Sequence, residues 1–213
     1  MILIGQYDSP YVRRVGIALT LYGYTFEHRP WSTFGDGDKI EPFNPLRRVP
    51  TLVLDNGEIV LESAYALDWL DEQVRALDDV APLIAASGPD RQKTLYYIAL
   101  SMGFSDKTIA LFYEQVLHKE KSPVWLERCQ TQIAAVLDVL EKIRAGAKSQ
   151  WLLGGAMTHA DIALACSLRH AREAHPSIDF GRWPALAFHS AQCEQMEVFK
   201  LISQPFIGPK TED

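Results

Sequence analysis

The sequence predicts two domains, a small α/β domain of element order β-α-β, loop, β-β-α and an all-helical domain after it. Short apolar runs alternate with two helical stripes over residues 1–76, whereas helical periodicity dominates from residue 90 onward. Residues 77–89 contain two adjacent aspartates, two prolines and a glycine, a composition typical of a linker. We therefore expect an α/β domain over 1–76, a linker over 77–89 and a helical domain over 90–213.

The α/β domain is expected to begin with a short buried strand over residues 2–6. Apolar residues at helical spacing follow over 10–22, which predicts a helix directly after the first strand. A second strand is expected over 25–29. Residues 31–44 combine proline, glycine and charged residues, so they predict a loop with at most a short helix.

A hairpin closes the predicted sheet. Its strands are the apolar runs 51–54 and 58–61, which the Asp-Asn-Gly sequence at 55–57 separates. An Asn-Gly pair favours the positive φ angles of a type I′ turn. Ser63 is placed to cap a helix that runs to about residue 74 and presents one apolar stripe.

In the second predicted domain, capping residues indicate where the helices begin and end. A long helix is expected over 90–117, and a second over 123–144, with Ser122 as its N-cap and Gly146 as its stop. Residues 158–161, Thr-His-Ala-Asp, match a capping box at the start of a third helix. That helix is apolar nearly all round, which predicts a central position in the domain. His159, inside the capping box, is expected to be a surface or loop histidine and not an acid or base. A last amphipathic helix is expected over 184–201.

Composition excludes several classes of function. The net charge is −6 and neither domain carries a basic field, so we expect no nucleic-acid partner. No window approaches the length of a membrane span, so we expect no membrane insertion. The three cysteines, Cys129, Cys166 and Cys193, form no CxxC motif, so we expect buried thiols in a reducing cytoplasm and no metal site.

Four motifs stand in order along this element pattern, at 9–15 (Ser-Pro-Tyr-Val-Arg-Arg-Val), 44–51 (Asn-Pro-Leu-Arg-Arg-Val-Pro-Thr), 62–63 (Glu-Ser) and 158–161. Together they resemble the soluble glutathione S-transferase family over essentially the whole chain. Ser9 stands where cysteine-type members carry Cys, so the chain resembles a serine-type bacterial or plant-like member. The resemblance implies a thioredoxin-like N-terminal domain, glutathione as co-substrate, a small apolar electrophile as second substrate, a homodimer and a cytoplasmic location.

The chemistry that this resemblance implies is activation of a thiol whose pKa in water is about 8.5. A hydroxyl at a helix N-terminus can donate to the sulfur while the helix field favours the thiolate. Ser9 occupies such a position, and on spacing alone it is equally well explained as an N-cap ahead of Pro10. Tyr7 is the rival donor, since some relatives of the family use a tyrosine just after the first strand.

By the same resemblance, other segments hold glutathione. Val49 and Pro50 resemble the cis-proline loop that presents a main-chain N–H and C=O to the cysteinyl part. Glu62 and Ser63 would hold the amino and carboxylate groups of the γ-glutamyl part, with a plain N-cap as the structural alternative. Candidates for the glycyl carboxylate are Lys39 and Arg13.

The second-substrate pocket is expected to be lined by apolar and aromatic residues from both predicted domains, although such stripes are more often core. The candidates are Tyr7, Tyr11, Phe34, Met102, Ser105, Ile109 and Phe112. The sequence leaves open a glutathione transferase, a peroxidase, isomerase or dehalogenase of the same fold, and a binding protein without catalysis.

Overall fold

A computed structural model describes residues 1–77 and 80–209 of the chain. The chain divides into two compact units, and we describe each by itself. The first unit comprises Met1–Ile84 and Met196–Ile207, and the second is built on Ala85–Gln195. Asp78 and Asp79 of the predicted linker, and residues 210–213, lie outside the described residues.

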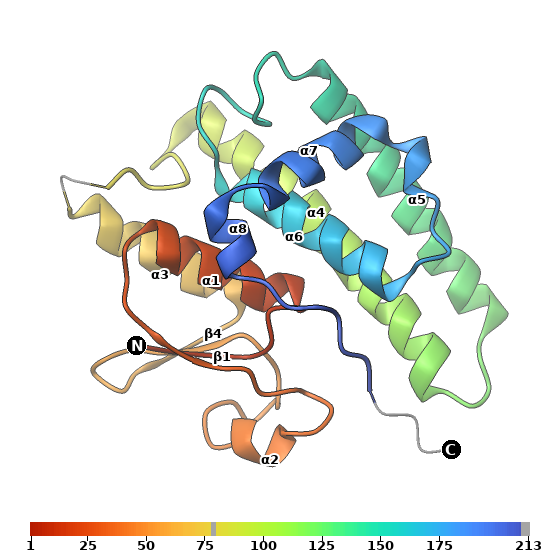
Figure 1. Ribbon diagram of the computed structural model, residues 1–213, viewed down its shortest axis with the longest axis horizontal. Coiled ribbons are helices and arrows are strands. Elements are labelled where there is room, and N and C mark those ends of the chain that lie inside the picture. Colours follow the sequence, from red (N-terminus) through yellow and green to blue (C-terminus); the bar gives the residue numbers. More distant parts are fainter. Residues whose placement is uncertain (78–79, 210–213) are drawn as a thin grey trace. The chain divides into compact units, whose positions relative to one another are not determined.

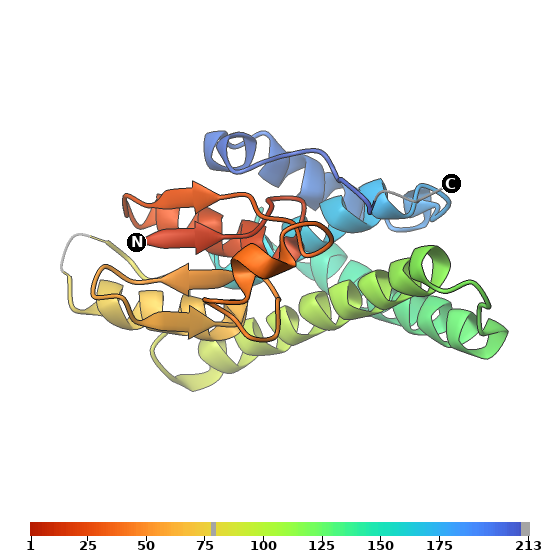
Figure 2. The same ribbon diagram turned by 90° about the horizontal axis from the view of Figure 1, so that it is seen from below.

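A four-stranded sheet of order β2-β1-β3-β4 forms the centre of the first unit. β1 runs parallel to β2 and antiparallel to β3, and β3 and β4 form the predicted hairpin. Helices α1 and α3 lie side by side on one side of the sheet and the short α2 lies on the other (Figure 1, Figure 2). The predicted order β-α-β, loop, β-β-α is therefore confirmed. The elements are β1 (Ile2–Ile4), α1 (Pro10–Leu21), β2 (Glu27–Arg29), α2 (Gly37–Ile40), β3 (Thr51–Val53), β4 (Ile59–Leu61) and α3 (Ser63–Arg75).

The hairpin turn differs from the predicted type I′ turn. Asn56 does not have a positive φ; the positive φ, 85°, is at Gly57. Gly57 donates its N–H to the carbonyl of Leu54 at 3.0 Å, and Leu54 donates to the carbonyl of Glu58 at 2.8 Å. This pattern is a type I turn followed by a glycine bulge, the usual three-residue alternative to type I′.

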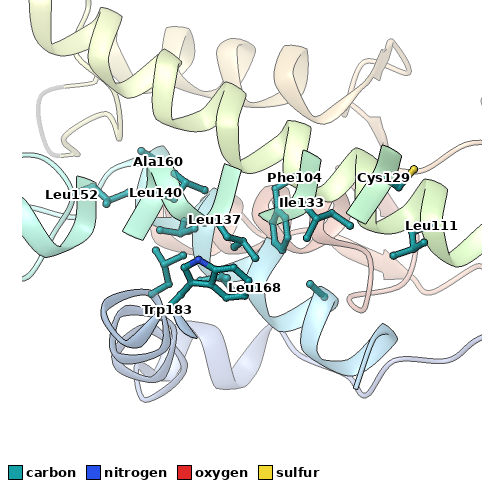
Figure 3. Close-up of a cluster of buried hydrophobic side chains, with 13 residues drawn as sticks. Phe104, Leu111, Cys129, Ile133, Leu137, Leu140, Leu152, Ala160, Leu168 and Trp183 are labelled. Atoms are coloured by element: carbon teal, nitrogen blue, oxygen red, sulfur yellow. The ribbon is translucent and has the colours of Figure 1, made fainter. Parts of the chain in front are cut away.

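The second unit consists of helices around one apolar core. α5 and α6 each pack against both α4 and α7 (Figure 1). Phe104, Leu137, Leu168 and Trp183 lie within the core cluster (Figure 3). The elements are α4 (Gly88–Leu117), α5 (Pro123–Gly146), α6 (His159–Ala174), the 3-10 helix η1 (Phe180–Arg182) and α7 (Pro184–Glu194).

Two predicted caps are present in this unit. The hydroxyl of Ser122 accepts from the N–H of Trp125 at 3.3 Å, and Thr158 and Asp161 form the capping box of α6. Most of α6 is buried, as its apolar surface predicted. The expectation for His159 is wrong: its side chain is 3% exposed, because α6 is buried from its first residue.

The predicted helix over 184–201 is two helices. α7 ends at Glu194, Met196 is extended with ψ 140°, and α8 (Glu197–Leu201) follows. The break coincides with the point where the chain leaves the second unit and returns to the first. Apolar periodicity continues through both pieces, so it could not locate this change of packing partner.

The first residues of α4 also differ from the prediction, because the helix begins at Gly88 and includes part of the expected linker. Pro89 lies in the first turn, where main-chain N–H groups have no acceptor within the helix, so the N–H that proline lacks costs no hydrogen bond. In the described part of the chain, none of the helices has both the length and the apolar character that crossing a bilayer requires.

Candidate functional site

The register of the sheet aligns three segments at one end of it. Ile4 of β1 pairs with Thr51 of β3, and Thr51 pairs with Leu61 of β4. The residues that continue this row are Gly5, Pro50 and Glu62. The turn into α1, the Val49–Pro50 loop and the start of α3 are therefore neighbours across the sheet end.

Gly5 allows the closest of these approaches. Its φ is +129°, and a Cβ built on it would lie 2.5 Å from Cγ2 of Val12 and 2.8 Å from Cβ of Val49. Any other residue would push α1 and the Val49–Pro50 loop away from the end of β1. This glycine thus sets the spacing between two of the three segments.

Ser9 is the N-cap of α1, with Pro10 in the first turn. Its Oγ accepts from the N–H of Val12 at 3.5 Å, a long and weak hydrogen bond. A hydroxyl that accepts one such bond keeps its own hydrogen for donation. The cap and a donor role toward a bound thiolate are therefore compatible in one side chain.

The Val49–Pro50 peptide bond is cis, as the family resemblance implied. The buried side chain of Asn44 shapes this loop: its Nδ2 donates to the carbonyl of Arg48 at 2.9 Å, and its Oδ1 accepts from the N–H of Leu46 at 3.0 Å. Asn44 stands in the quoted motif at 44–51, yet the sequence assigned it no role.

Glu62 has a positive φ of 65°, with ψ 133°, which is costly for a residue with a side chain. Its carboxylate lies 3.3 Å from the guanidinium of Arg48, and both side chains are largely exposed. Such backbone strain at the N-terminus of a helix is typical of functional positions. Arg48 is a second residue that sequence reasoning did not single out.

Ser63 is the first residue of α3 and not its cap, which corrects the capping expectation; Glu62 holds the N-cap position without a side-chain cap bond. The Ser63 Oγ instead accepts from Nε and Nη2 of Arg14, at 3.0 and 2.7 Å. Both side chains are buried. This buried cation behind the start of α3 was missed, because an arginine inside an apolar helix gives no sequence signal for its partner.

Comparison with known proteins agrees with this geometry. A family model described as the glutathione S-transferase N-terminal domain matches residues 3–76, and one described as the C-terminal domain matches residues 123–188. The Escherichia coli K12 protein YibF, an uncharacterized GST-like protein, is 31% identical over 170 residues, which cover 79% of this chain and 80% of YibF. The chain belongs to the glutathione S-transferase family.

Other relatives within the family differ in their named activities. A glutathione S-transferase of Methylobacterium radiotolerans JCM 2831, solved in complex with glutathione sulfonate, matches with a TM-score of 0.89 and 28% identity, covering 100% of this chain and 98% of that one. Mouse maleylacetoacetate isomerase is 25% identical over 99% of this chain and 94% of its own length. The fold is thus that of the glutathione S-transferases, with relatives that include both transferases and isomerases.

The two basic candidates for the glycyl carboxylate lie in different surroundings. Arg13 is buried, and its Nε and Nη2 donate to the main-chain carbonyls of Ile202 and Phe199, both at 2.8 Å. These bonds hold α8 against α1, so we withdraw Arg13 from the site. Lys39 is exposed and pairs with Asp36 at 2.6 Å, which lowers the pKa of Asp36.

Tyr7 is buried and stacks on His28, with the ring centroids 3.8 Å apart. Burial raises the pKa of Tyr7 to about 12 and lowers the pKa of His28, whose Nε2 lies 2.8 Å from the carbonyl oxygen of Gly5. A phenol with so high a pKa is a poorer donor to a thiolate than one near its usual value of about 10. Among the other candidates of the first unit, Tyr11 is half-buried and Phe34 is exposed.

The candidates on α4 do not form one uniform lining. Ser105 is fully buried and donates to Ser167 of α6 at 2.8 Å, so it belongs to the helix interface and we withdraw it. Phe112 packs edge-on against His175, with centroids 6.2 Å apart. Met102 and Ile109 are half-buried.

The cysteines are free thiols and all three are buried, as predicted. Burial raises the pKa of Cys129, which keeps that thiol protonated at neutral pH. Over residues 1–77 and 80–209, no group of three or more His, Cys, Asp or Glu side chains is arranged to hold a metal ion.

Proposed function

We propose that this protein is a glutathione transferase that activates the thiol of bound glutathione as a thiolate for attack on a small apolar electrophile. The observation that carries the proposal is the alignment of the Ser9 turn, the cis Val49–Pro50 loop and the Glu62–Ser63 helix start at one sheet end. These segments carry a hydroxyl donor for a thiolate, main-chain groups for a peptide and polar side chains for charged ends, which are the groups that a tripeptide thiol requires.

Each part of glutathione has a matching group in this arrangement. Ser9 would donate its hydroxyl hydrogen to the sulfur, with the N-terminus of α1 adding to the field. The main-chain groups of Val49 would pair with the cysteinyl part. Ser63 and Glu62 would bind the carboxylate and ammonium groups of the γ-glutamyl part, while the exposed Lys39 remains for the glycyl carboxylate.

Tyr11 and Phe34 of the first unit stay candidates for contact with the second substrate, and by the same family resemblance so do Met102, Ile109 and Phe112 of the second unit. An apolar and aromatic lining suits an electrophile with little charge. We also propose that the chain acts as a cytoplasmic homodimer, which rests on family membership and is tested by sedimentation at micromolar concentration.

A spectroscopic titration tests the proposal. Mixing the protein with glutathione at neutral pH should produce the ultraviolet absorbance of a thiolate, with an apparent pKa below 8.5 for the bound thiol. Initial rates with a panel of aryl halides, epoxides and peroxides should then show conjugation of at least one apolar electrophile. Tight binding of glutathione without any thiolate signal would favour a binding protein without catalysis.

A glutathione-dependent isomerase is the second candidate, and the near full-length similarity to the mouse isomerase favours it. In such a reaction the thiolate would add to a carbon–carbon double bond conjugated with a carbonyl and give an enolate. After rotation about the new single bond, the enolate would re-form the double bond and expel the thiolate, so glutathione is not consumed. Following the isomerisation of maleylacetoacetate with catalytic amounts of glutathione separates the two activities. A transferase consumes glutathione in proportion to product, and an isomerase does not.

A further inference from the structure

A buried cation, the Arg14 guanidinium, lies behind the N-terminus of α3 and donates to Ser63. Arg14 lies within α1 and its side chain is 3% exposed, as is Ser63. The two residues are 49 positions apart in the chain, and two hydrogen bonds of 3.0 and 2.7 Å join them. Because two donors of one rigid guanidinium bind the same atom, they fix the position of the Ser63 oxygen relative to α1.

The direction of these bonds determines what the Ser63 hydroxyl can do. A guanidinium has five donors and no acceptor, so the Ser63 Oγ must be the acceptor in both bonds. Its two lone pairs are then occupied, and its only remaining capacity is donation of the hydroxyl hydrogen. A serine without Arg14 could instead accept from the N–H groups of the first turn.

We propose that Arg14 is a positioning residue that makes Ser63 an obligate hydrogen-bond donor and thereby tunes the start of α3 for a carboxylate. This inference rests on the proposed binding of glutathione, whose γ-glutamyl end carries the carboxylate in question. The buried positive charge and the helix N-terminus act in the same direction, because both favour negative charge next to Ser63.

Glu62 indicates that the ligand group bound at the start of α3 is an amino-acid end, with both an ammonium and a carboxylate group, and not a simple anion. Its carboxylate stands directly before Ser63 in the chain, where an anion alone would be repelled. A ligand end with both a carboxylate and an ammonium group satisfies the two neighbouring sites at once. Arg14 therefore acts on the carboxylate half of a zwitterion.

The test measures by calorimetry how two ligands bind to four proteins, namely the wild type, two Arg14 variants and one control variant. The ligands are glutathione and its analogue in which the glutamyl α-carboxylate is a carboxamide. The wild type should bind glutathione about tenfold or more tighter than the analogue, since a hydrogen bond to a charged group is stronger than one to a neutral group. In Arg14→Gln this ratio should fall to within about threefold, and Arg14→Lys, which keeps a charge and one donor, should restore part of it.

Arg13→Gln is the matched control, because Arg13 is the adjacent buried arginine of the same helix and donates to main-chain carbonyls of residues 199 and 202. It should lower the melting temperature yet leave the ratio between the two ligands unchanged. A purely structural Arg14 would weaken both ligands equally, and an unchanged ratio in Arg14→Gln overturns the proposal.

Two further results keep the test decisive. If Arg14→Gln does not fold, the Arg14→Lys ratio decides, since a value equal to that of the wild type contradicts a role for the two-pronged contact. If the wild type binds neither ligand, the proposed function fails and this inference falls with it. Normal binding with no preference for the carboxylate contradicts the role of Arg14 alone.

Discussion

Tyr7 lies flat against His28, with the ring planes inclined by 7°. Burial of the phenol raises the pKa of Tyr7 to about 12, while Ser9, two residues later, is half-buried at the helix start. Ser9→Ala should therefore raise the thiol pKa of bound glutathione and lower kcat/KM by about tenfold or more, on the order of 1.4 kcal/mol. Tyr7→Phe keeps the stack and should leave the thiol pKa unchanged. A thiol pKa that rises only in Tyr7→Phe would reverse the assignment.

The strained backbone of Glu62 gives a second prediction. Both Glu62→Gly and Glu62→Ala remove the carboxylate, so both should weaken glutathione binding. Glycine adopts a φ of 65° without a Cβ penalty, whereas alanine does not. We expect Glu62→Gly to be more stable than Glu62→Ala by about 1 kcal/mol in urea denaturation, the opposite of the order found inside helices. Equal stabilities would mean that the positive φ is not retained in solution.

Asp161 gives a prediction about stability alone. Its carboxylate accepts from the N–H groups of Leu152 and Thr158, both at 2.8 Å, and it is fully buried. Asp161→Ala leaves these donors without a partner and should cost about 2–3 kcal/mol of unfolding free energy. The control is Asp179→Ala, because Asp179 accepts from the N–H of Gly181 at an exposed position and its loss should cost about 0.5 kcal/mol or less. Similar losses in both variants would contradict the assigned role of the buried box.

His175 makes stability depend on pH. Burial lowers its pKa in the folded protein below the usual 6.5, although its Nε2, 2.7 Å from the carbonyl oxygen of Thr108, opposes the shift. Below about pH 6.5 the unfolded chain therefore binds more protons than the folded one, and stability falls with falling pH until the folded pKa is reached. The urea midpoint should decrease from about pH 7.5 to pH 5.5, and less steeply in His175→Gln. The same slope in the variant would exclude His175 as a source.

The local part of this structure could be predicted from the sequence. Thr158 and Asp161 stand three residues apart with their partners next to them, so a four-residue pattern suffices to predict the cap. The hairpin and the element order of the first unit likewise follow from short-range apolar patterns. The turn type of the hairpin was not predicted correctly, because Asn56-Gly57 fits two loop geometries that differ in which residue has the positive φ.

Contacts between distant residues could not be predicted in this way. Arg13 and Arg14 are adjacent and chemically identical, yet one donates to carbonyls of the C-terminal segment and the other to Ser63. Their positions on the helix differ by about 100°, and only the packed neighbours decide which partner each finds. The family resemblance therefore names Arg13 as a site candidate, whereas in the structure Arg13 donates to the C-terminal segment and Arg14 to Ser63.

The C-terminal segment gives the last prediction, because it contacts the turn that carries Ser9. The N–H of Tyr7 donates to Oε1 of Gln204 at 2.9 Å, and the N–H of Ile207 donates to a carboxylate oxygen of Asp8 at the same distance. Loss of one such bond costs about 1 kcal/mol and frees the amide of Tyr7 for exchange. Gln204→Met keeps the length of the side chain but removes the acceptor, so hydrogen exchange at the Tyr7 amide should accelerate by about fivefold. Gln204→Glu retains an acceptor oxygen and should leave exchange slow. Because Ser9 would lose part of its support, kcat should fall in Gln204→Met more than glutathione affinity does. Equal exchange rates in the two variants would show that Gln204 does not restrain this turn.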